Sequence, residues 1–350
     1  MELFPQQSPS YILSFQFSTW YPKFKSASIK STIVRPLSQE FIDYLNADQV
    51  FVPKGSENIP AESSLSDDED DDSVDAEEGH VFAFPELDEK IRAAITEYGA
   101  VFPKLNFSSP KDASWILPAS SPLKCTSPAD VYLLLKSSDF ITHDLSQSAI
   151  FAGRDDSDSS YELELVLRKW YAVDRSRELR CFVRNNVLIG ISQRDPNYYD
   201  YLNDTATHSK IVHAVVDFWS TKIQPGWTNE ANYVFDLLLT RDLSRAHIID
   251  FNPYAPRTDP LLFSYEELAE ALSNEADPPT DFRSTVPSPE FRVIDSPSHP
   301  AASSKAPANQ HNMVPFEALS LSSGRDIEEF KELWQEKIKE SMQAEEEEDC

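Results

Sequence analysis

Apolar residues recur at helical spacing in four parts of the chain. In residues 87–98 they lie on one face of a helix: Leu87, Ile91, Ala94, Ile95 and Tyr98. Gly99 follows at the position where that helix is expected to end. The same spacing predicts helices over 130–141 and 208–223, and a last amphipathic helix over 326–343.

Other segments alternate apolar and polar residues, as half-buried strands do. Strands are predicted over 100–107, over 161–173, over both halves of a hairpin at 177–193, and twice within 232–252. Asn185 and Asn186 fit the hairpin because asparagine tolerates the positive φ of a tight turn.

Changes in composition divide the 350 residues into four parts. We expect a first lobe over 1–160, a second lobe over 161–275, an extended Pro/Ser-rich linker over 276–325, and an amphipathic helix with an acidic tail over 326–350. Residues from about 55 to 80 contain the run "DDEDDDSVDAEE". Such a composition buries too little apolar surface to fold, so a disordered acidic insert is predicted inside the first lobe.

The formal net charge of −28 narrows the choice of partners. Without the nine acids of residues 67–78 and the five of residues 345–349, 45 acidic residues still face 31 basic ones. A chain this acidic repels phosphate backbones, so direct nucleic-acid binding is not expected. A protein partner with a basic surface is favoured instead.

The cysteines and the apolar runs indicate where the protein works. Cys125, Cys181 and Cys350 are odd in number and widely spaced, which suits neither a disulfide framework nor a zinc cluster. No apolar run approaches the ~20 residues that cross a bilayer, and the first twenty residues lack a basic start. We therefore expect a soluble cytoplasmic protein, and a monomer, with no membrane partner.

The two strands within 232–252 are expected to bring polar side chains together. If residues 233–239 pair antiparallel with residues 247–251 so that opposed numbers sum to 486, Asp236 lies opposite Asp250. Because side chains alternate between faces, one face then carries Val234, Asp236, Leu238, Ile248, Asp250 and Asn252.

That face has the ligand chemistry of a hard divalent cation. Directly opposed side chains are about 5 Å apart, and two carboxylates at that distance repel unless a cation intervenes. Asp236, Asp250 and the amide oxygen of Asn252 suit Mg²⁺, which needs nucleotide phosphates when few protein groups bind it. The alternative is structural: Asp250 and Asn252 end a strand, and Asp236 is exposed or forms a salt bridge.

Glycine is too scarce for the common phosphate-binding loops. Residues 250–252, "DFN", suggest the Asp-Phe-Gly of protein kinases, but the seven glycines never form G-x-G-x-x-G or a P-loop. Bound phosphates must then be held by side-chain cations, and Lys104, Arg180 and Arg194 are candidates. Lys104 near the end of an apolar strand is also explained by a carboxylate partner or by snorkelling to water. A regular hairpin would place Arg180 and Arg194 on opposite faces unless a bulge intervenes.

The segment after the strand at 161–169 suggests a place for a nucleotide base. Lys169 ends this strand and the chain continues without a turn residue. An extended segment between two lobes can offer backbone N–H and C=O groups to adenine, with Trp170, Tyr171 and Val173 beside the ring.

Taken in order, these residues resemble the ATP-grasp superfamily. The matching positions are Lys104, Lys169, Trp170, Asp236, Asp250 and Asn252. The segments "VFPKLNFSSPKDASWI", "LVLRKWYAVDRSRELRCFV" and "HIIDFNPY" resemble more closely the eukaryotic cell-division-cycle-123 family, the assembly chaperones of translation initiation factor 2. The resemblance covers about residues 10–275 and implies ATP with Mg²⁺ bound between two α+β lobes with antiparallel sheets.

The resemblance also implies roles for residues and a partner. It makes Asp236, Asp250 and Asn252 metal ligands and residues 169–173 the adenine slot. Phosphate contacts would come from Lys104, Arg180 and Arg194. The implied protein partner is the gamma subunit of the initiation factor.

One segment departs from the general ATP-grasp pattern. The usual Gly-rich loop is replaced by "NFSSPKDASW", in which Ser108, Ser109 and Ser114 are possible hydrogen-bond donors to phosphate. An ATP-binding chaperone is therefore the leading hypothesis, without a catalytic residue assigned. An ATP-dependent carboxylate–amine ligase is the alternative, because the superfamily includes such enzymes, and an ATP-free scaffold is a third possibility.

Overall fold

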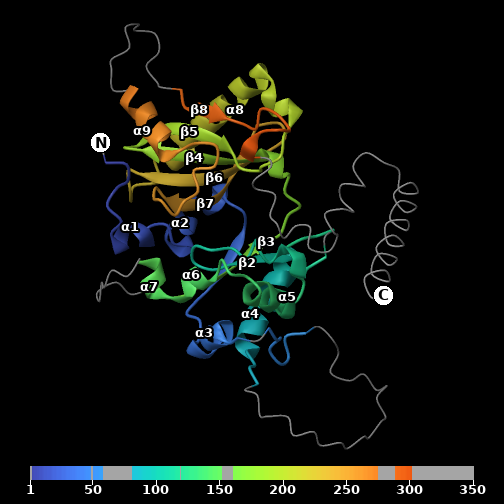
Figure 1. The fold of residues 1–350 in the computed structure, drawn as a ribbon. Helices are drawn as coiled ribbons and strands as arrows, with labels where there is room; N and C mark the ends of the chain where they lie inside the picture. The colour runs from blue at the N-terminus through green and yellow to red at the C-terminus, as the bar shows by residue number, and fades with distance from the viewer. Residues whose placement is uncertain are drawn as a thin grey trace, which may run out of the picture. The chain divides into compact units, whose positions relative to one another are not determined.

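The computed structural model describes residues 2–48, 50–57, 81–118, 120–151, 161–274 and 288–301. These residues belong to the first of two compact units, Met1–Ala302. Two separate sheets, each with its own helices, form the framework (Figure 1). The predicted α+β class with two lobes is confirmed.

The smaller sheet has three antiparallel strands. Their order is β1 (Ser31–Val34), β3 (Leu165–Lys169) and β2 (Val101–Lys104). Opposed positions include Lys104 with Val166 and Phe102 with Arg168. The strand predicted over 161–173 is thus shorter, and it lies in the centre of this sheet.

The larger sheet has five strands. Their order is β7 (Ala246–Pro253), β6 (Tyr233–Leu239), β4 (Glu178–Arg184), β5 (Val187–Gln193) and β8 (Glu290–Arg292). Neighbours are antiparallel except β5 and β8, which are parallel. The predicted hairpin at 177–193 forms β4 and β5, and Asn185 and Asn186 have the positive φ expected of its turn.

Helices cover both sheets. Their bounds are α1 (Pro9–Leu13), α2 (Phe17–Phe24), α3 (Gln39–Asn46), α4 (Pro85–Tyr98), α5 (Pro128–Lys136), α6 (Thr142–Leu145), α7 (Gln147–Ile150), α8 (Thr205–Phe218) and α9 (Tyr265–Asn274). A π-helical turn, Trp219–Ile223, extends α8, so the helix predicted over 208–223 is confirmed. Short 3₁₀ turns occupy Lys25–Ala27, Ser114–Ile116, Arg175–Arg177 and Asp200–Asn203.

Local sequence explains where two of these helices begin and end. Pro85 starts α4, where its missing N–H costs no hydrogen bond, and Gly99 ends it with φ of 82°. In α5 the Ser127 side chain accepts from the N–H of Asp130 while Asp130 accepts from the N–H of Ser127. Both helices pack on the smaller sheet and support one of its faces.

The two faces of the smaller sheet differ in chemistry. Leu165 and Leu167 are fully buried in a core that also contains residues of α4 and α5. Alternation places Val166 and Arg168 on the opposite face, together with Lys104. Cations therefore lie on the face turned away from α4 and α5.

The larger sheet has its own core, to which the start of the chain contributes. The rings of Trp227 and Phe251 stack with centroids 4.2 Å apart, and Trp20 and Phe24 of α2 contact Phe251. Helices α1 and α2 thus lie against the larger sheet (Figure 1), although they precede the smaller one in sequence. The part of the predicted first lobe, 1–160, that forms α1 and α2 therefore packs in the core of the larger sheet.

Residues 288–301 fall inside the predicted extended linker but pack on the larger sheet. β8 pairs with Gly190–Ser192, and the buried Ile294 donates its N–H to the Gln193 side chain (3.0 Å). The predicted acidic insert lies almost entirely outside the described residues, and the predicted helix and tail at 326–350 wholly outside them. Within the described part of the chain, no helix has the length and apolar character to cross a membrane.

Candidate functional site

The predicted pairing of β6 and β7 is confirmed where it matters for the site. Asp236 lies opposite Asp250, and Val234 lies opposite Asn252. Beyond Asp236 the register shifts, so that Leu237 pairs with Ile248. Ile249 is the extra residue of a bulge, and the prediction that Ile248 shares the face of the two aspartates is wrong.

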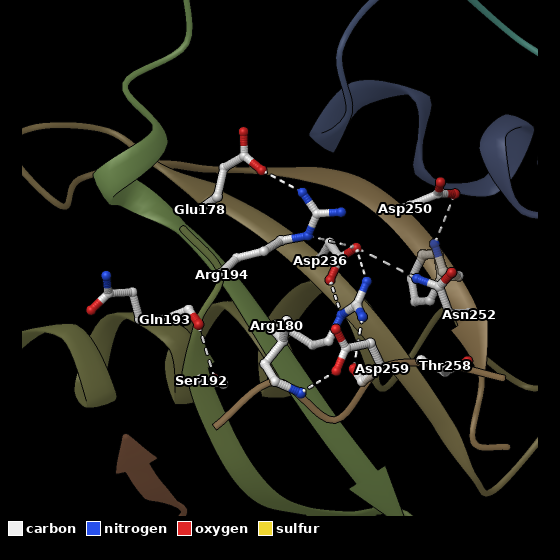
Figure 2. A network of polar contacts seen from close by, with 12 residues as sticks. Glu178, Arg180, Ser192, Gln193, Arg194, Asp236, Asp250, Asn252, Thr258 and Asp259 are labelled. Carbon is white, nitrogen blue, oxygen red and sulfur yellow. Dashed lines mark hydrogen bonds and ion pairs between the residues drawn. The ribbon is translucent and has the colours of Figure 1, made fainter. Parts of the chain in front are cut away.

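Asp236 is held by two arginines rather than standing free. Arg180 donates to both of its oxygens, at 2.8 and 2.9 Å, and the Nε atom of Arg194 lies 3.5 Å away (Figure 2). Burial alone would raise the pKa of Asp236, but the charges of Arg180 and Arg194 outweigh it and hold this pKa far below its usual range. The amide of Asn252 reaches the same carboxylate at 3.5 Å. The salt-bridged alternative for Asp236 therefore describes the structure.

A second bulge places both arginines on one face. Arg180 lies opposite Ser192, and the Arg194 N–H donates to the Glu178 carbonyl at 3.1 Å. The register shifts between Phe182 and Val183 of β4, with Ile189 as the extra residue of β5. The regular-hairpin expectation of opposite faces is thus overturned. Arg194 also binds the carboxylate of Glu178, at 2.7 Å.

Lys104 joins the two sheets. Its ammonium on β2 lies 3.0 Å from a carboxylate oxygen of Asp250 on β7. The Lys104 side chain is completely buried and lies over the ring of Phe17, 5.3 Å from the centroid. The contact with Asp250 is an ion pair without hydrogen-bond geometry, so Lys104 has no hydrogen-bond acceptor among the described residues. Of the readings open at Lys104, the carboxylate partner is the one present here.

Arg168 is a site residue that the sequence interpretation missed. Arg168 is 4% exposed, and its guanidinium lies over the ring of Phe17, 5.6 Å from the centroid. Its Nε and Nη2 atoms have no hydrogen-bond acceptor within the described structure. Burial lowers the pKa of Arg168, and the charge of Asp250 opposes that shift. The signal was available: strict alternation from Leu165 and Leu167 puts Arg168 on the face of Lys104.

Lys111 is the second missed residue. Lys111 is exposed as a residue, but burial of its ammonium group and the charge of Arg194 lower the pKa of Lys111 to about 8, against the attraction of Glu178, Asp236 and Asp250. The charges that act on Lys111 thus include those of Arg194, Glu178, Asp236 and Asp250 of the larger sheet. A lysine inside the segment replacing the Gly-rich loop was the signal for it.

The buried carboxylate of Asp144 fixes the loop that leads to Lys111. It accepts from the N–H groups of Phe107 and Ser108, at 2.8 and 2.9 Å, and from the Ser108 hydroxyl at 2.8 Å. Ser108 is therefore not a free donor for phosphate. The carbonyl of Ser109 accepts from the Lys111 N–H at 2.8 Å, while Ser114 begins a 3₁₀ turn.

Part of the backbone of the predicted base-binding segment is already hydrogen-bonded to the protein. The N–H of Lys169 donates to the Lys30 carbonyl (2.8 Å) and that of Trp170 to the Ala100 carbonyl (3.0 Å), so neither N–H is free for a base. The Trp170 indole donates to Pro122 at 3.1 Å, which fixes the ring. Alternation puts the Lys169 side chain on the face opposite to Lys104, where it lies 5.3 Å from the ring centroid of Tyr171. Tyr171 is 48% exposed, so a surface for a base is left around residues 171–173.

Together these groups form what we term the charge cluster. It consists of Lys104, Lys111, Arg168, Glu178, Arg180, Arg194, Asp236 and Asp250. Five cations face three carboxylates, so the cluster has a surplus of positive charge in a protein that is otherwise strongly acidic. A bound anion with several negative charges would satisfy the donors left without acceptors.

Comparisons with known proteins show the family to which the chain belongs. A family model described as D123 matches residues 20–322. The chain belongs to the D123 family. A D123 relative from Sclerotinia sclerotiorum, named translation initiation factor eIF2 assembly protein, is 34% identical over 93% of this chain and 86% of its own length. A Xenopus laevis protein of the same name is 42% identical over 75% of this chain and 78% of its own. The solved structure of Cdc123 from Schizosaccharomyces pombe is 33% identical, with a TM-score of 0.63 over 83% of this chain and 98% of that one.

The carboxylate and amide groups of this D123 protein can be compared with the ligands that a metal ion needs. Among the described residues, no group of three or more His, Cys, Asp and Glu side chains has the arrangement of a metal site. Asp236, Asp250 and Asn252 nevertheless present oxygen atoms on one face of the β6–β7 hairpin, as hard cations require. Two carboxylates and one amide suit a cation that draws its remaining ligands from a phosphate compound.

Proposed function

We propose that this chain is an assembly chaperone for eIF2 that binds ATP and Mg²⁺ between its two sheets and binds the gamma subunit of the factor. The chaperone role is supported by the names of its relatives, which the chain matches over most of their lengths. The nucleotide part is carried by one observation: the buried Nε and Nη2 atoms of Arg168 have no hydrogen-bond acceptor among the described residues.

The phosphates would be held by the cations of the charge cluster. Lys104 and Arg168 approach from the smaller sheet, whereas Arg180 and Arg194 approach from the larger one. Lys111, with its lowered pKa, would add a contact from the loop that begins at Phe107. A buried donor without an acceptor costs about 1–3 kcal/mol, and a charged donor costs more. A phosphate oxygen that accepts from the donor would remove this cost.

Mg²⁺ would be held by Asp236, Asp250 and Asn252. When bound, it neutralises negative charge on the phosphates and ties them to the larger sheet. Each of the two carboxylates is paired with a cation in the structure: Asp236 with Arg180, and Asp250 with Lys104. To hold the nucleotide and the metal, these cations would have to contact phosphate and these carboxylates would have to contact Mg²⁺ in place of each other.

Adenine would lie against residues 170–173. Because the N–H groups of Lys169 and Trp170 are already bonded, the polar edge of the base would meet the backbone of Tyr171 to Val173. Trp170, fixed by its indole bond to Pro122, would provide a rigid wall for the base.

Binding can be tested by calorimetry with Mg-ATP. Asp250→Ala and Arg168→Met should each lower the affinity at least tenfold, because each removes a charged group from the cluster. Arg241→Met is the matched control, since Arg241 is exposed in the turn after β6 and should leave affinity unchanged. Wild-type affinity in both cluster variants would refute the assignment of the site.

The chaperone role needs a separate measurement. Purified protein should capture the isolated gamma subunit at moderate salt, and an acidic body suits a basic partner surface. No capture with folded components would refute the partner. Steady release of ADP in the presence of an amine acceptor would favour the ligase alternative instead.

A further inference from the structure

The loop that follows β2 carries Lys111. It spans residues 105–116 and leads from the smaller sheet to the 3₁₀ turn Ser114–Ile116. The charges that act on the Lys111 ammonium nevertheless belong to residues of the larger sheet: Arg194, Glu178, Asp236 and Asp250. Lys111 is thus coupled electrostatically to the larger sheet, although the chain reaches it from the smaller one.

A buried carboxylate anchors this loop before Lys111. Asp144 of α6 is completely buried and accepts two backbone N–H groups, those of Phe107 and Ser108, and the Ser108 hydroxyl. The backbone of Asp144 is itself held, because the Tyr161 hydroxyl donates to its carbonyl at 2.7 Å. Three hydrogen bonds to one carboxylate therefore fix the backbone three residues before Lys111.

A second carboxylate anchors the loop after Lys111. Asp112 is the next residue along the chain, and its carboxylate accepts from the Ser138 hydroxyl at 2.6 Å. It also accepts from the N–H groups of Asp139 and Phe140, at 2.7 and 3.2 Å. Both anchors therefore tie the loop to the same stretch of chain, residues 138–144, one on each side of Lys111.

The backbone between the two anchors is closed by short turns. The Lys111 N–H donates to the Ser109 carbonyl at 2.8 Å, and the Ala113 N–H donates to the Pro110 carbonyl at 3.3 Å. Pro110 has a fixed φ, and Ala113 is completely buried. A side chain on a backbone that is already ordered loses less entropy when it binds a ligand.

We propose that Asp112 and Asp144 are positioning residues, which hold Lys111 where it contacts the phosphates of the bound nucleotide without any closure of the loop. Neither carboxylate would touch the nucleotide itself. The inference rests on the proposed nucleotide site. It adds that the Lys111 loop is in place before the nucleotide binds, whereas a lid would close over the phosphates afterwards.

Hydrogen exchange tests whether the loop is fixed. The amides of Phe107 and Ser108, bonded to Asp144, and the amide of Asp139, bonded to Asp112, should exchange slowly in the protein without nucleotide. Adding Mg-ATP should change their rates by less than about twofold. Fast exchange without nucleotide, slowed about tenfold or more by Mg-ATP, is the behaviour of a closing lid and would overturn the proposal.

Calorimetry with Mg-ATP tests whether Asp112 acts through Lys111. Asp112→Ala should lower the affinity about fivefold in the wild type and cause no further loss in Lys111→Met. Asp112→Asn removes the same charge but keeps an oxygen acceptor, so it should restore most of the affinity. Asp139→Ala is the matched control, because Asp139 is exposed and only its backbone N–H is bonded to Asp112.

The outcomes separate the positioning role from the nucleotide site. If the wild type binds Mg-ATP and Asp112→Ala either costs nothing or costs as much in Lys111→Met as in the wild type, the positioning role is refuted and the nucleotide site stands. If the wild type does not bind Mg-ATP at all, both are refuted.

Discussion

The ion pair between Lys104 and Asp250 allows the effect of a single charge to be worked out. Lys104 is completely buried, and the Asp250 side chain is 15% exposed. Removing one partner of a buried pair costs about 3–5 kcal/mol because the other charge is left without compensation. Asp250 keeps some water and the attraction of Arg168, so Lys104→Met should lower the free energy of unfolding by about 3 kcal/mol, the lower end of that range.

Replacing both members should behave differently. In Lys104→Met combined with Asp250→Asn no charge is left unpaired, and exchanging a buried pair for neutral groups is often nearly free of cost. Most of the stability lost in Lys104→Met should therefore return. Affinity for Mg-ATP should not return, because the lysine and the aspartate are both expected to contact the ligand.

Two assays on the same proteins test whether the Lys104–Asp250 pair stabilises the fold and whether it contacts Mg-ATP. Urea unfolding of the wild type, both single variants and the double variant gives the coupling between Lys104 and Asp250, and calorimetry gives their Mg-ATP affinities. If the double variant is as unstable as the sum of the single ones, the pair contributes nothing as a pair. If Lys104→Met binds Mg-ATP like the wild type, Lys104 is not a phosphate contact.

Three further predictions concern other parts of the site. The pKa of Asp236 is lowered in the folded state, so its contribution to stability is complete well above its ordinary value of 3.8 and is lost as the pH falls from there through the lower pKa of the folded state; thermal unfolding below about pH 4 should show this loss, and the loss should be smaller in Asp236→Asn, where other carboxylates still titrate. The pKa of Lys111 is about 8, so Mg-ATP affinity should fall by up to about tenfold per unit as the pH rises through 8, and Lys111→Met should remove this dependence in calorimetry. A Cβ atom at Gly190 would lie 2.9 Å from Leu268, so Gly190→Ala should destabilise the larger sheet by about 1–3 kcal/mol in urea unfolding, with an unchanged midpoint contradicting the close approach.

The opposition of Asp236 and Asp250 was predictable because it depends on two simple rules. Side chains alternate along strands, and a short connection makes neighbouring strands antiparallel. A register shifted by one residue would have put the two carboxylates on opposite faces of the sheet. The apolar run before Asp250 was enough to set the register. Strands β2 to β7 and helices α4, α5 and α8 followed from the same periodicities, whereas β1 and β8 were not predicted.

The bulges are what periodicity does not reveal. An extra residue at Ile249 or Ile189 turns every later side chain of its strand to the other face, and each of these isoleucines follows another branched apolar residue that it resembles. For β5 a signal existed, because Gly190 is a single glycine inside a predicted strand, which often marks a bulge or a close contact. β7 has no such residue. The partners of Asp236 depended on the β5 bulge, since Arg180 and Arg194 meet only because of it.

The return of residues 288–301 to the larger sheet affects how the protein can be divided. Composition alone suggests cutting the chain near residue 275, where the Pro/Ser-rich part begins. Such a fragment would lack β8 and uncover the backbone of β5, and exposed strand edges promote aggregation. It would also lose the bond between the Ile294 N–H and the Gln193 side chain, next to Arg194. A recombinant form that keeps the larger sheet intact must therefore include β8 and Ile294.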